Sequence, residues 1–325
     1  MVAVPWRVAW HEALYGPAGF YRHEPPARHY STATHGPPGA VLAEALWRWA
    51  DRLGMPAIVD IGAGRGELLT HLHAARPDRP LLGCDVIDRP GPLPQAVGWL
   101  PSPGGAALPD QLRDLTGVLV VAHEWLDVVP CDVARVDDDG TRRLVHVDPA
   151  SGAESLGEPL GEQDRLWCER HWPGSAPGDR VEIGVTREDA WADLLSRVSS
   201  GAVLAVDYGH ERDHRPADGT LTAYRHGAQV TPVPDGTCDL TAHVAVDALC
   251  HDRLLTQAEA FREVWPGVER ADPARAGDDP RGFLLGLERS AATSELTRPD
   301  GYGGFRWVLA CLPEAGPRGA ADWPP

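Results

Sequence analysis

The chain has 325 residues, of which 43% are hydrophobic and 24% charged, and its formal net charge at pH 7 is −17. This length allows one large domain or two small ones. Binding to nucleic acid phosphates requires a basic face, so the acidic balance argues against nucleic acid as the main partner and permits a basic substrate. None of the six cysteines stands in a C-x-x-C pair, which argues against a zinc site or a redox dithiol.

Residues 1–37 are aromatic and are punctuated by glycine and proline, so we expect no long helix there. The segment is predicted to be an N-terminal arm held by its aromatic side chains, or a lid over a ligand pocket. Its beginning lacks the apolar core of a signal peptide, and no run in the chain approaches the ~20 apolar residues of a membrane span. With its scattered cysteines, this favours a soluble protein of the cytoplasm, without a membrane partner.

Residues 38–131 are predicted to form the first part of an α/β core. Residues 38–53 have helical spacing of their apolar side chains, with proline at the start and glycine just after the end. The stretch AIVDIGAGRGE at 57–67 then predicts a buried strand, a glycine turn and the start of a second helix. A strand, a glycine turn and a helix in this order form a cradle of the kind that binds nucleotides.

The residues around this cradle favour S-adenosyl-L-methionine (SAM) as the ligand. The glycine spacing is G-x-G-x-G, not the G-x-G-x-x-G of dinucleotide folds, and Asp60 stands two positions before the first glycine. An acid at this point repels a pyrophosphate but suits an ammonium group. Asp85 follows Gly66 by nineteen positions, close to the roughly 20 expected for an acid that binds ribose hydroxyls. The alternative is a tight strand-to-helix turn without a ligand. The predicted cofactor-binding residues are Asp60, Gly62, Ala63, Gly64, Gly66, Asp85, Val86 and His123.

Acidic residues follow the next buried strand. We expect a loop with a short strand near 97–100 over residues 88–109, a short helix over 110–117 and a strand over 118–122. Ligands of open α/β sheets lie beyond the carboxyl ends of the strands. If a helical turn begins here, Glu124 and Asp127 face the same side; the alternative is that both acids serve the start of a helix.

Residues 132–185 are predicted to be an inserted segment of strands and loops, with a hairpin turn at Asp139-Gly140. Residues 186–313 contain the remainder of the core, with a helix over 187–200, a buried strand that ends at Asp207 and Tyr208, a helix near 281–292 and a closing strand from Phe305. Asp207 and Tyr208 either serve the site or pack and cap the end of the strand. Residues 314–325 are predicted to be a loose tail.

Several of these stretches resemble the MidA-like (DUF185) family of SAM-dependent methyltransferases, which includes the mitochondrial arginine methyltransferase needed for assembly of respiratory complex I. The blocks YGPAGFY, IVDIGAGRGELL, HEWLDVVP, AVDYG, TLTAYRHG and DLTAHVAVDAL occur in the order of the family and span about residues 14–250. The family usually has Glu at Asp60 and Asn at His123. Of its block G-D-F-x-T-A-P-E, only HYSTATH is present: Tyr30 and Thr32 fit, His29 replaces the Asp, and the Glu is missing.

The resemblance implies a Rossmann-like class I methyltransferase core with a mostly parallel sheet. From the cysteine pattern we expect no metal site. The resemblance also implies transfer of a methyl group from SAM to nitrogen, with an arginine side chain of a protein or peptide as the first candidate. Paired carboxylates orient a guanidinium through forked hydrogen bonds. The predicted catalytic residues are Glu124, Asp127 and His243, with Asp239 on the acceptor side and Tyr21 and Thr32 as candidates for a lid.

Three other functions remain open on the sequence. One is a methyltransferase for a small molecule or peptide of secondary metabolism, which the altered N-terminal block favours. Another is an assembly factor that binds SAM without catalysis. A nicotinamide oxidoreductase is disfavoured by the glycine spacing and by Asp60.

Overall fold

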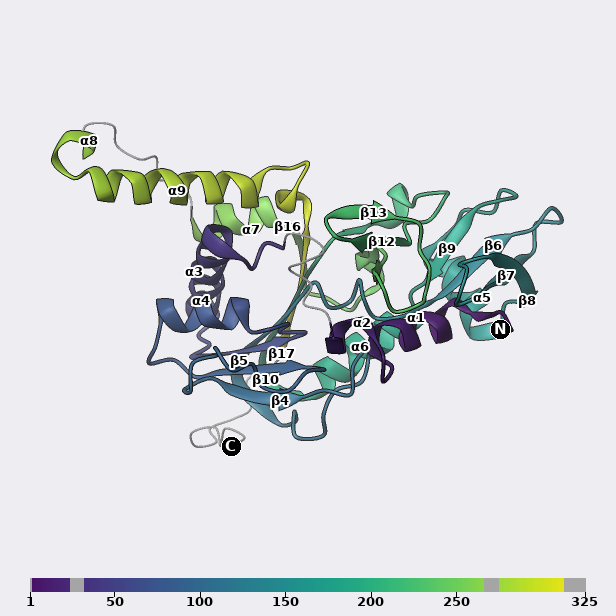
Figure 1. The fold of residues 1–325 in the computed structure, drawn as a ribbon, viewed down its shortest axis with the longest axis horizontal. Helices are drawn as coiled ribbons and strands as arrows, with labels where there is room; N and C mark the ends of the chain where they lie inside the picture. The colour runs from purple at the N-terminus through teal and green to yellow at the C-terminus, as the bar shows by residue number, and fades with distance from the viewer. Residues whose placement is uncertain (1, 24–31, 266–274, 313–325) are drawn as a thin grey trace.

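The computed structural model describes residues 2–23, 32–265 and 275–312. Its centre is a seven-stranded sheet in the order β16-β17-β10-β5-β2-β3-β4 (Figure 1). The neighbours from β10 to β4 run parallel, and β17 runs antiparallel to both β10 and β16. The strands are β2 (Ala57–Ile61), β3 (Leu81–Asp85), β4 (Gly98–Pro101), β5 (Leu115–His123), β10 (Val198–Asp207), β16 (Arg253–Thr256) and β17 (Arg306–Leu312).

The order of strands reverses between β2 and β5. The chain adds β3 and β4 on one side of β2, and then places β5 and β10 on the other side. In open α/β sheets a crevice forms at such a reversal, beyond the carboxyl ends of the strands. The glycine turn follows β2 and the acidic segment from Glu124 follows β5, so both border this crevice.

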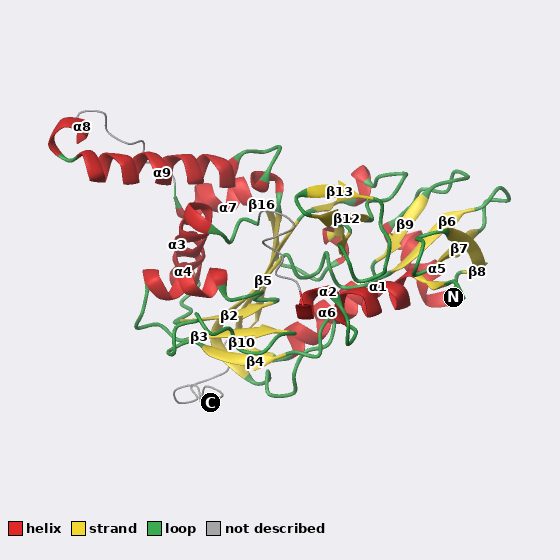
Figure 2. Ribbon diagram, viewed as in Figure 1, coloured by secondary structure: helices red, strands yellow, loops and turns green. Residues whose placement is uncertain are grey.

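Helices cover both faces of the sheet (Figure 2). One core contains the apolar sides of α3, α4 and α7, and α9 packs outside against α3 and α7; α6 contributes to the core of the opposite face. Because both faces are covered, the strands are buried Val- and Leu-rich runs. These helices are α3 (Gly36–Arg52), α4 (Glu67–Ala75), α6 (Val185–Ser196), α7 (Gln257–Val264) and α9 (Pro280–Thr297), with α8 (Arg275–Asp278) before α9.

A second, antiparallel sheet lies beside the main one, at the right of Figure 1. It contains β6 (Asp132–Val136) and β7 (Arg142–Val147), which form the expected hairpin around Asp139-Gly140, together with β1 (Val4–Pro5), β8 (Glu154–Pro159) and β9 (Arg180–Ile183). Helix α5 (Glu162–His171) packs with this sheet and was not expected from the sequence. Smaller pairings join β12 (Thr222–Arg225), β13 (Ala228–Val230) and β14 (Asp239–Thr241), and β11 (Gly209–His210) with β15 (Val244–Ala245).

The expectation of no long helix in the N-terminal segment is wrong. Helix α1 spans Trp6–Tyr15, and its Trp6, Trp10 and Leu14 are almost fully buried against the second sheet and β14. Their spacing of four residues places them on one helix face. The glycines and prolines of the segment lie outside α1, because Pro5 directly precedes it and the others begin at Gly16, after it has ended. Helix α2 (Phe20–His23) follows after a short turn.

The short helix expected over residues 110–117 is also absent. This stretch forms turns and then enters β5 at Leu115. Asp114 has a φ of 54° and Gly117 a φ of 63°, in the left-handed region where a right-handed helix cannot continue. His29, Tyr30 and the tail 314–325 lie outside the described residues. Within the described ranges, no helix is both long and apolar enough to cross a membrane.

Candidate functional site

The glycine turn after β2 is tied to the end of β3. The backbone N–H groups of Gly62 and Ala63 both donate to the carbonyl of Cys84, over 2.9 and 3.1 Å. Gly62, Gly64 and Gly66 have φ of 70°, 58° and 79°, values that favour glycine. The sequence therefore places glycine at the three positions where the turn requires left-handed backbone.

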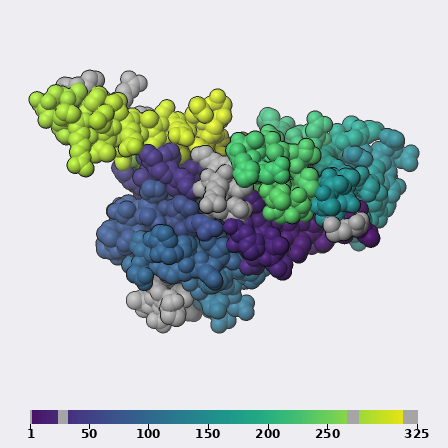
Figure 3. Space-filling model, viewed as in Figure 1, coloured from purple at the N-terminus to yellow at the C-terminus, as the bar shows by residue number. Residues whose placement is uncertain are grey.

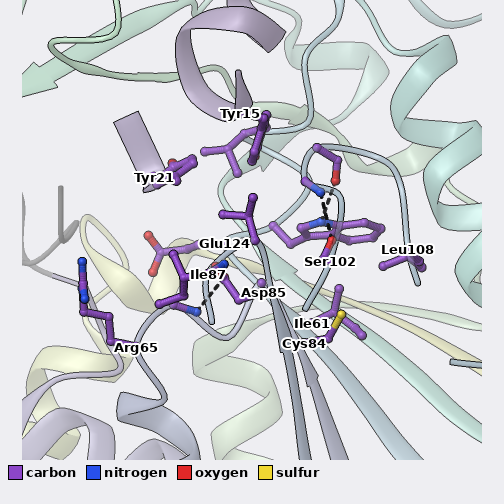
Figure 4. A pocket seen from close by; sticks show the side chains of 17 residues that line it. Tyr15, Tyr21, Ile61, Arg65, Cys84, Asp85, Ile87, Ser102, Leu108 and Glu124 are labelled. Atoms are coloured by element: carbon purple, nitrogen blue, oxygen red, sulfur yellow. Dashed lines mark hydrogen bonds between the residues drawn. The ribbon is translucent and has the colours of Figure 1, made fainter. Parts of the chain in front are cut away.

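Two hollows flank this turn. The first hollow has a volume of about 700 Å³ and the second about 540 Å³, and both volumes include space that is open to solvent. Both are lined by Gly62, Gly64, Arg65 and Glu124. Figure 4 shows the first hollow, with Tyr15 and Tyr21 on one side and Ile61 and Cys84 on the other.

Most predicted cofactor residues line these hollows. Asp85 and Val86 line the first, and Asp60, Ala63 and His123 line the second. Gly66 lines neither hollow. It begins α4, and a side chain there would meet Leu93 at 2.6 Å, so Gly66 shapes the turn and does not face the hollows.

Asp85 holds the turn and faces the first hollow. Its Oδ2 accepts a hydrogen bond from the N–H of Gly64 at 2.9 Å, and its Oδ1 accepts one from the N–H of Ile87 at 3.4 Å. Burial raises the pKa of Asp85 to about 6, although these hydrogen bonds oppose the rise. Asp85 is therefore largely ionised at neutral pH and presents a hydrogen-bond acceptor to the hollow.

Asp60 is a buried carboxyl group in the second hollow. It is 2% exposed, and no group of the described residues hydrogen-bonds to its side chain. Burial raises the pKa of Asp60 well above its usual value, and the charges of Asp85 and Glu67 raise it further. A cationic group in this hollow would remove that penalty.

Glu124 stands between the two hollows in a strained conformation. Its φ is 51°, which is uncommon for a residue with a side chain, and its N–H donates to the carbonyl of Val206 at 2.9 Å. Its Oε1 is buried without a hydrogen-bond partner among the described residues. Burial, followed by the charges of Asp127 and Asp239, raises the pKa of Glu124 well above its usual value.

His123 accompanies Glu124 as an uncharged neighbour. Its Nδ1 lies 3.3 Å from Oε1 of Glu124. Burial lowers the pKa of His123 to about 4, so the imidazole is neutral at pH 7 and forms no ion pair there. His123 therefore leaves the charge of Glu124 unbalanced.

The expected helical turn with Glu124 and Asp127 on one side is wrong, since left-handed backbone at Glu124 prevents it. Asp127 lines neither hollow. Its Oδ2 accepts hydrogen bonds from the hydroxyl groups of Tyr208 and Thr241. Oδ2 of Asp207 accepts from the N–H groups of Leu126 and Asp127, at 3.1 and 3.2 Å. This network holds the turn behind Glu124.

A buried cation, Arg187, contacts this network. It is 2% exposed and donates to the carbonyls of Asp127, Val129 and His243, over 2.8, 3.1 and 2.9 Å. Its charge lowers the pKa of Asp127, while burial as the larger effect raises it. Arg187 therefore stabilises the network through backbone carbonyls as well as through charge.

The remaining predicted residues lie around the site. His243 lines neither hollow; its ring lies 5.1 Å from that of Tyr208. Asp239 is buried and accepts a hydrogen bond of 2.5 Å from the hydroxyl of Tyr21, which lines the first hollow. Thr32 lines the second hollow.

Several lining residues were not predicted. Trp125 could have been predicted, because it follows Glu124 directly in the sequence. Its side chain would lie 3.3 Å from a Cβ placed on Gly62. Ser102, Gly104 and Leu108 come from a proline- and glycine-rich loop without a recognisable pattern. Tyr15 reaches the first hollow because α1 ends beside it.

The donor set fits SAM. Acids at Asp60, Glu67, Asp85 and Glu124 line the hollows, whereas the Arg and His side chains among their lining residues are Arg65, His35 and His123. SAM carries a sulfonium and an ammonium group, and ribose hydroxyls that can donate to a carboxylate. The described residues contain no His, Cys, Asp and Glu group that could hold a metal ion.

Comparisons with known proteins point to the same cofactor. The model of a family described as "Putative S-adenosyl-L-methionine-dependent methyltransferase" matches residues 93–261, which is just over half of the 325 residues. A COG1565 superfamily member from Burkholderia thailandensis, solved bound to S-adenosyl-homocysteine, superposes with a TM-score of 0.70 at 21% identity, covering 94% of this chain and 87% of that one.

A second structure of a COG1565 superfamily protein from Burkholderia thailandensis gives a TM-score of 0.69 at 22% identity, covering 95% of this chain and 87% of that one. At these identities the likeness shows a shared fold. It agrees with the mixed α/β sheet of a class I methyltransferase. No curated protein matches the chain.

Proposed function

The chain belongs to a family of SAM-dependent methyltransferases, and from this premise we propose that it methylates a nitrogen atom of a basic acceptor, in the first place an arginine side chain of a protein or peptide. The motifs that resemble MidA-like proteins support this finer assignment. The observation that carries it is the buried carboxylate of Glu124, which borders both hollows and whose Oε1 has no hydrogen-bond partner among the described residues.

SAM supplies a methyl group on a positively charged sulfur, which a nucleophile displaces. In our proposal Asp60 binds the ammonium of the methionine part, directly or through water, and Asp85 accepts the ribose hydroxyls. Gly62, Ala63 and Gly64 permit close approach of the backbone. Val86 and His123 complete the contacts from the ends of β3 and β5. Tyr15 of α1 and Tyr21 of α2 line the first hollow, and in our proposal they act as its lid.

We expect the affinity for SAM to fall when the pH is lowered through about 6, because burial raises the pKa of Asp85 to about 6. Below this pH the carboxyl group of Asp85 is protonated and accepts hydrogen bonds poorly. The Kd for SAM should therefore rise by a factor approaching tenfold for each pH unit. Titration calorimetry between pH 8 and pH 5 measures it. Asp85→Asn should bind weakly at every pH and lose this slope. An equal slope in both proteins would contradict the role of Asp85.

For the acceptor, we propose that Glu124 orients the guanidinium. A guanidinium stays protonated, with a pKa above ~12, so its nucleophilic nitrogen must be aligned and must give up a proton during transfer. In our proposal the carboxylate of Glu124 accepts a hydrogen bond that aligns the guanidinium, and it accepts the proton that the nitrogen loses during transfer. Asp127 contributes from behind, through its charge and its place in the network under the turn.

A row of rings leads away from His123, which lines the second hollow, through residues that line neither hollow. Phe305 lies 6.3 Å from His123, Tyr208 lies 5.4 Å from Phe305, and His243 lies 5.1 Å from Tyr208, between ring centroids. Planar cations stack on aromatic faces. In our proposal this row guides the acceptor, and His243 serves binding at its far end and not proton transfer.

Phe305→Ala is expected to raise the KM for the acceptor about fivefold or more, with an unchanged Kd for SAM, because a cation–π contact contributes about 1–2 kcal/mol. Steady-state kinetics with an unmethylated acceptor peptide measure the KM, and calorimetry with SAM measures the Kd, so the two effects are separated. Phe305→Tyr, which keeps a ring, should restore the KM. A rise in the Kd for SAM alone would place Phe305 on the cofactor side.

The test of the proposal is transfer of labelled methyl groups to a library of arginine-containing peptides, compared with a panel of small-molecule amines and phenols. Label in ω-methylarginine after hydrolysis supports the arginine assignment. Label confined to small molecules supports the alternative function, a methyltransferase of secondary metabolism. The departures from the family motif around His29 favour this alternative. SAM binding without any transfer would indicate a non-catalytic assembly factor.

A further inference from the structure

Helix α9 carries an exposed apolar face far from the two hollows in sequence. Leu284, Leu285 and Leu287 are 63%, 56% and 45% exposed, and they are three of the seven large apolar side chains that are exposed among the described residues. Ala292 and Leu296, near the other end of α9, are buried against the body. Figures 1 and 3 show the N-terminal half of α9 projecting beyond α3 and α4.

The exposed face has a charge at each end. Arg281, Leu284, Leu285 and Glu288 are spaced i, i+3, i+4 and i+7, so they share one side of the helix, with the leucines between the two charges. Arg281 and Glu288 are exposed and form no ion pair with a described residue.

These charges are not explained by the helix itself. A helix is stabilised by acids in its first turn and bases in its last turn, whereas Arg281 lies in the first turn of α9 and no base lies in the last. The residues of this face therefore fit contact with something outside the chain better than they fit an isolated helix.

We propose that this face binds the same face of a second copy of the chain, with the two α9 helices antiparallel. A two-fold axis midway between residues 284 and 285 brings Leu284 of one copy against Leu285 of the other. The same axis sets Arg281 of each copy opposite Glu288 of the other, so four leucines are flanked by two ion pairs. An isologous contact of this kind closes as a dimer.

The area of the exposed face limits the affinity with which the two copies bind. A stable interface buries about 800 Å² on each partner, and one exposed helix face is smaller than that. The dimer is therefore expected to form reversibly in the micromolar range. Sedimentation equilibrium of the full chain over a micromolar concentration series measures it.

Leu285→Glu should weaken the dimer roughly tenfold or more, since it puts a charge in the apolar centre. Leu166→Glu is the matched control, because Leu166 is 49% exposed on α5 and should leave the dimer unchanged. Thermal unfolding shows that each variant is folded. A wild-type chain that stays monomeric, or equal effects of the two substitutions, would overturn the proposal.

Reversal of the charges tests the antiparallel register. Arg281→Glu places two acids opposite each other and should weaken the dimer several-fold, as should Glu288→Arg. The double variant restores opposite charges at both ends and should recover the wild-type dissociation constant. Additive weakening in the double variant would exclude this pairing.

Discussion

Glu124→Gln is expected to lower the rate of methyl transfer by roughly 10²- to 10³-fold while the variant still binds SAM, because it removes one preorganised charge from the reacting centre. Glutamine has the same shape, so the strained turn and the neutral His123 beside it should persist. Single-turnover transfer measures the rate, and calorimetry measures SAM binding separately.

The pH dependence of this rate provides a second readout. Burial and neighbouring acids raise the pKa of Glu124, so the carboxylate forms only as the pH rises, and the wild-type rate should rise with it. Glu124→Gln should lose this part of the profile. Glu44→Gln is the matched control and should keep the wild-type profile, since Glu44 lines neither hollow and pairs with Arg48 and Arg289. Unchanged turnover in Glu124→Gln would remove Glu124 from the mechanism.

The parts of the fold that depend on local patterns could be predicted from the sequence. The strand, glycine turn and helix over 57–67 are confirmed by β2 and α4, and the hairpin around Asp139-Gly140 by β6 and β7. Helix α1 was missed because prolines and glycines just outside it were read as interruptions. The pairing of β1 with β7 joins Val4 to Val147, a contact that no local pattern encodes.

The site could be predicted where strands end. Asp60, Asp85 and Glu124 lie at the carboxyl ends of buried strands, and the reversal of strand order brings all three to the hollows. Asp127 could not be placed, because its position depends on the left-handed backbone at Glu124 and on Tyr208 and Thr241, which are distant in sequence. Sequence spacing indicates which residues are near the site, whereas the local backbone decides which of them face it.

Asp60→Asn is expected to weaken SAM binding roughly 10- to 100-fold, because a hydrogen bond to a charged group contributes about 1.5–3 kcal/mol. The same substitution should stabilise the ligand-free protein at neutral pH. Asp60 is 2% exposed without a hydrogen-bond partner among the described residues, so its ionisation in the folded chain carries a desolvation cost that asparagine does not.

The sign of this stability effect depends on pH. The pKa of Asp60 is higher in the folded than in the unfolded chain, so the penalty is absent below the unfolded pKa and grows as the pH rises toward the folded one. Asp60→Asn and wild type should therefore unfold alike near pH 4 and diverge above it, with the variant more stable. Thermal unfolding across pH, with and without SAM, measures both effects.

Asp51→Asn is a suitable control for this experiment. Asp51 lies on α3, where it pairs with Arg76 and Arg79 at the surface, so its substitution should leave SAM binding unchanged. If Asp60→Asn destabilised the ligand-free protein at neutral pH, Asp60 would be a structural acid and not one kept for a ligand. Weaker binding together with higher stability is the pattern expected of a charge that is costly in the empty hollow and compensated when a cation binds.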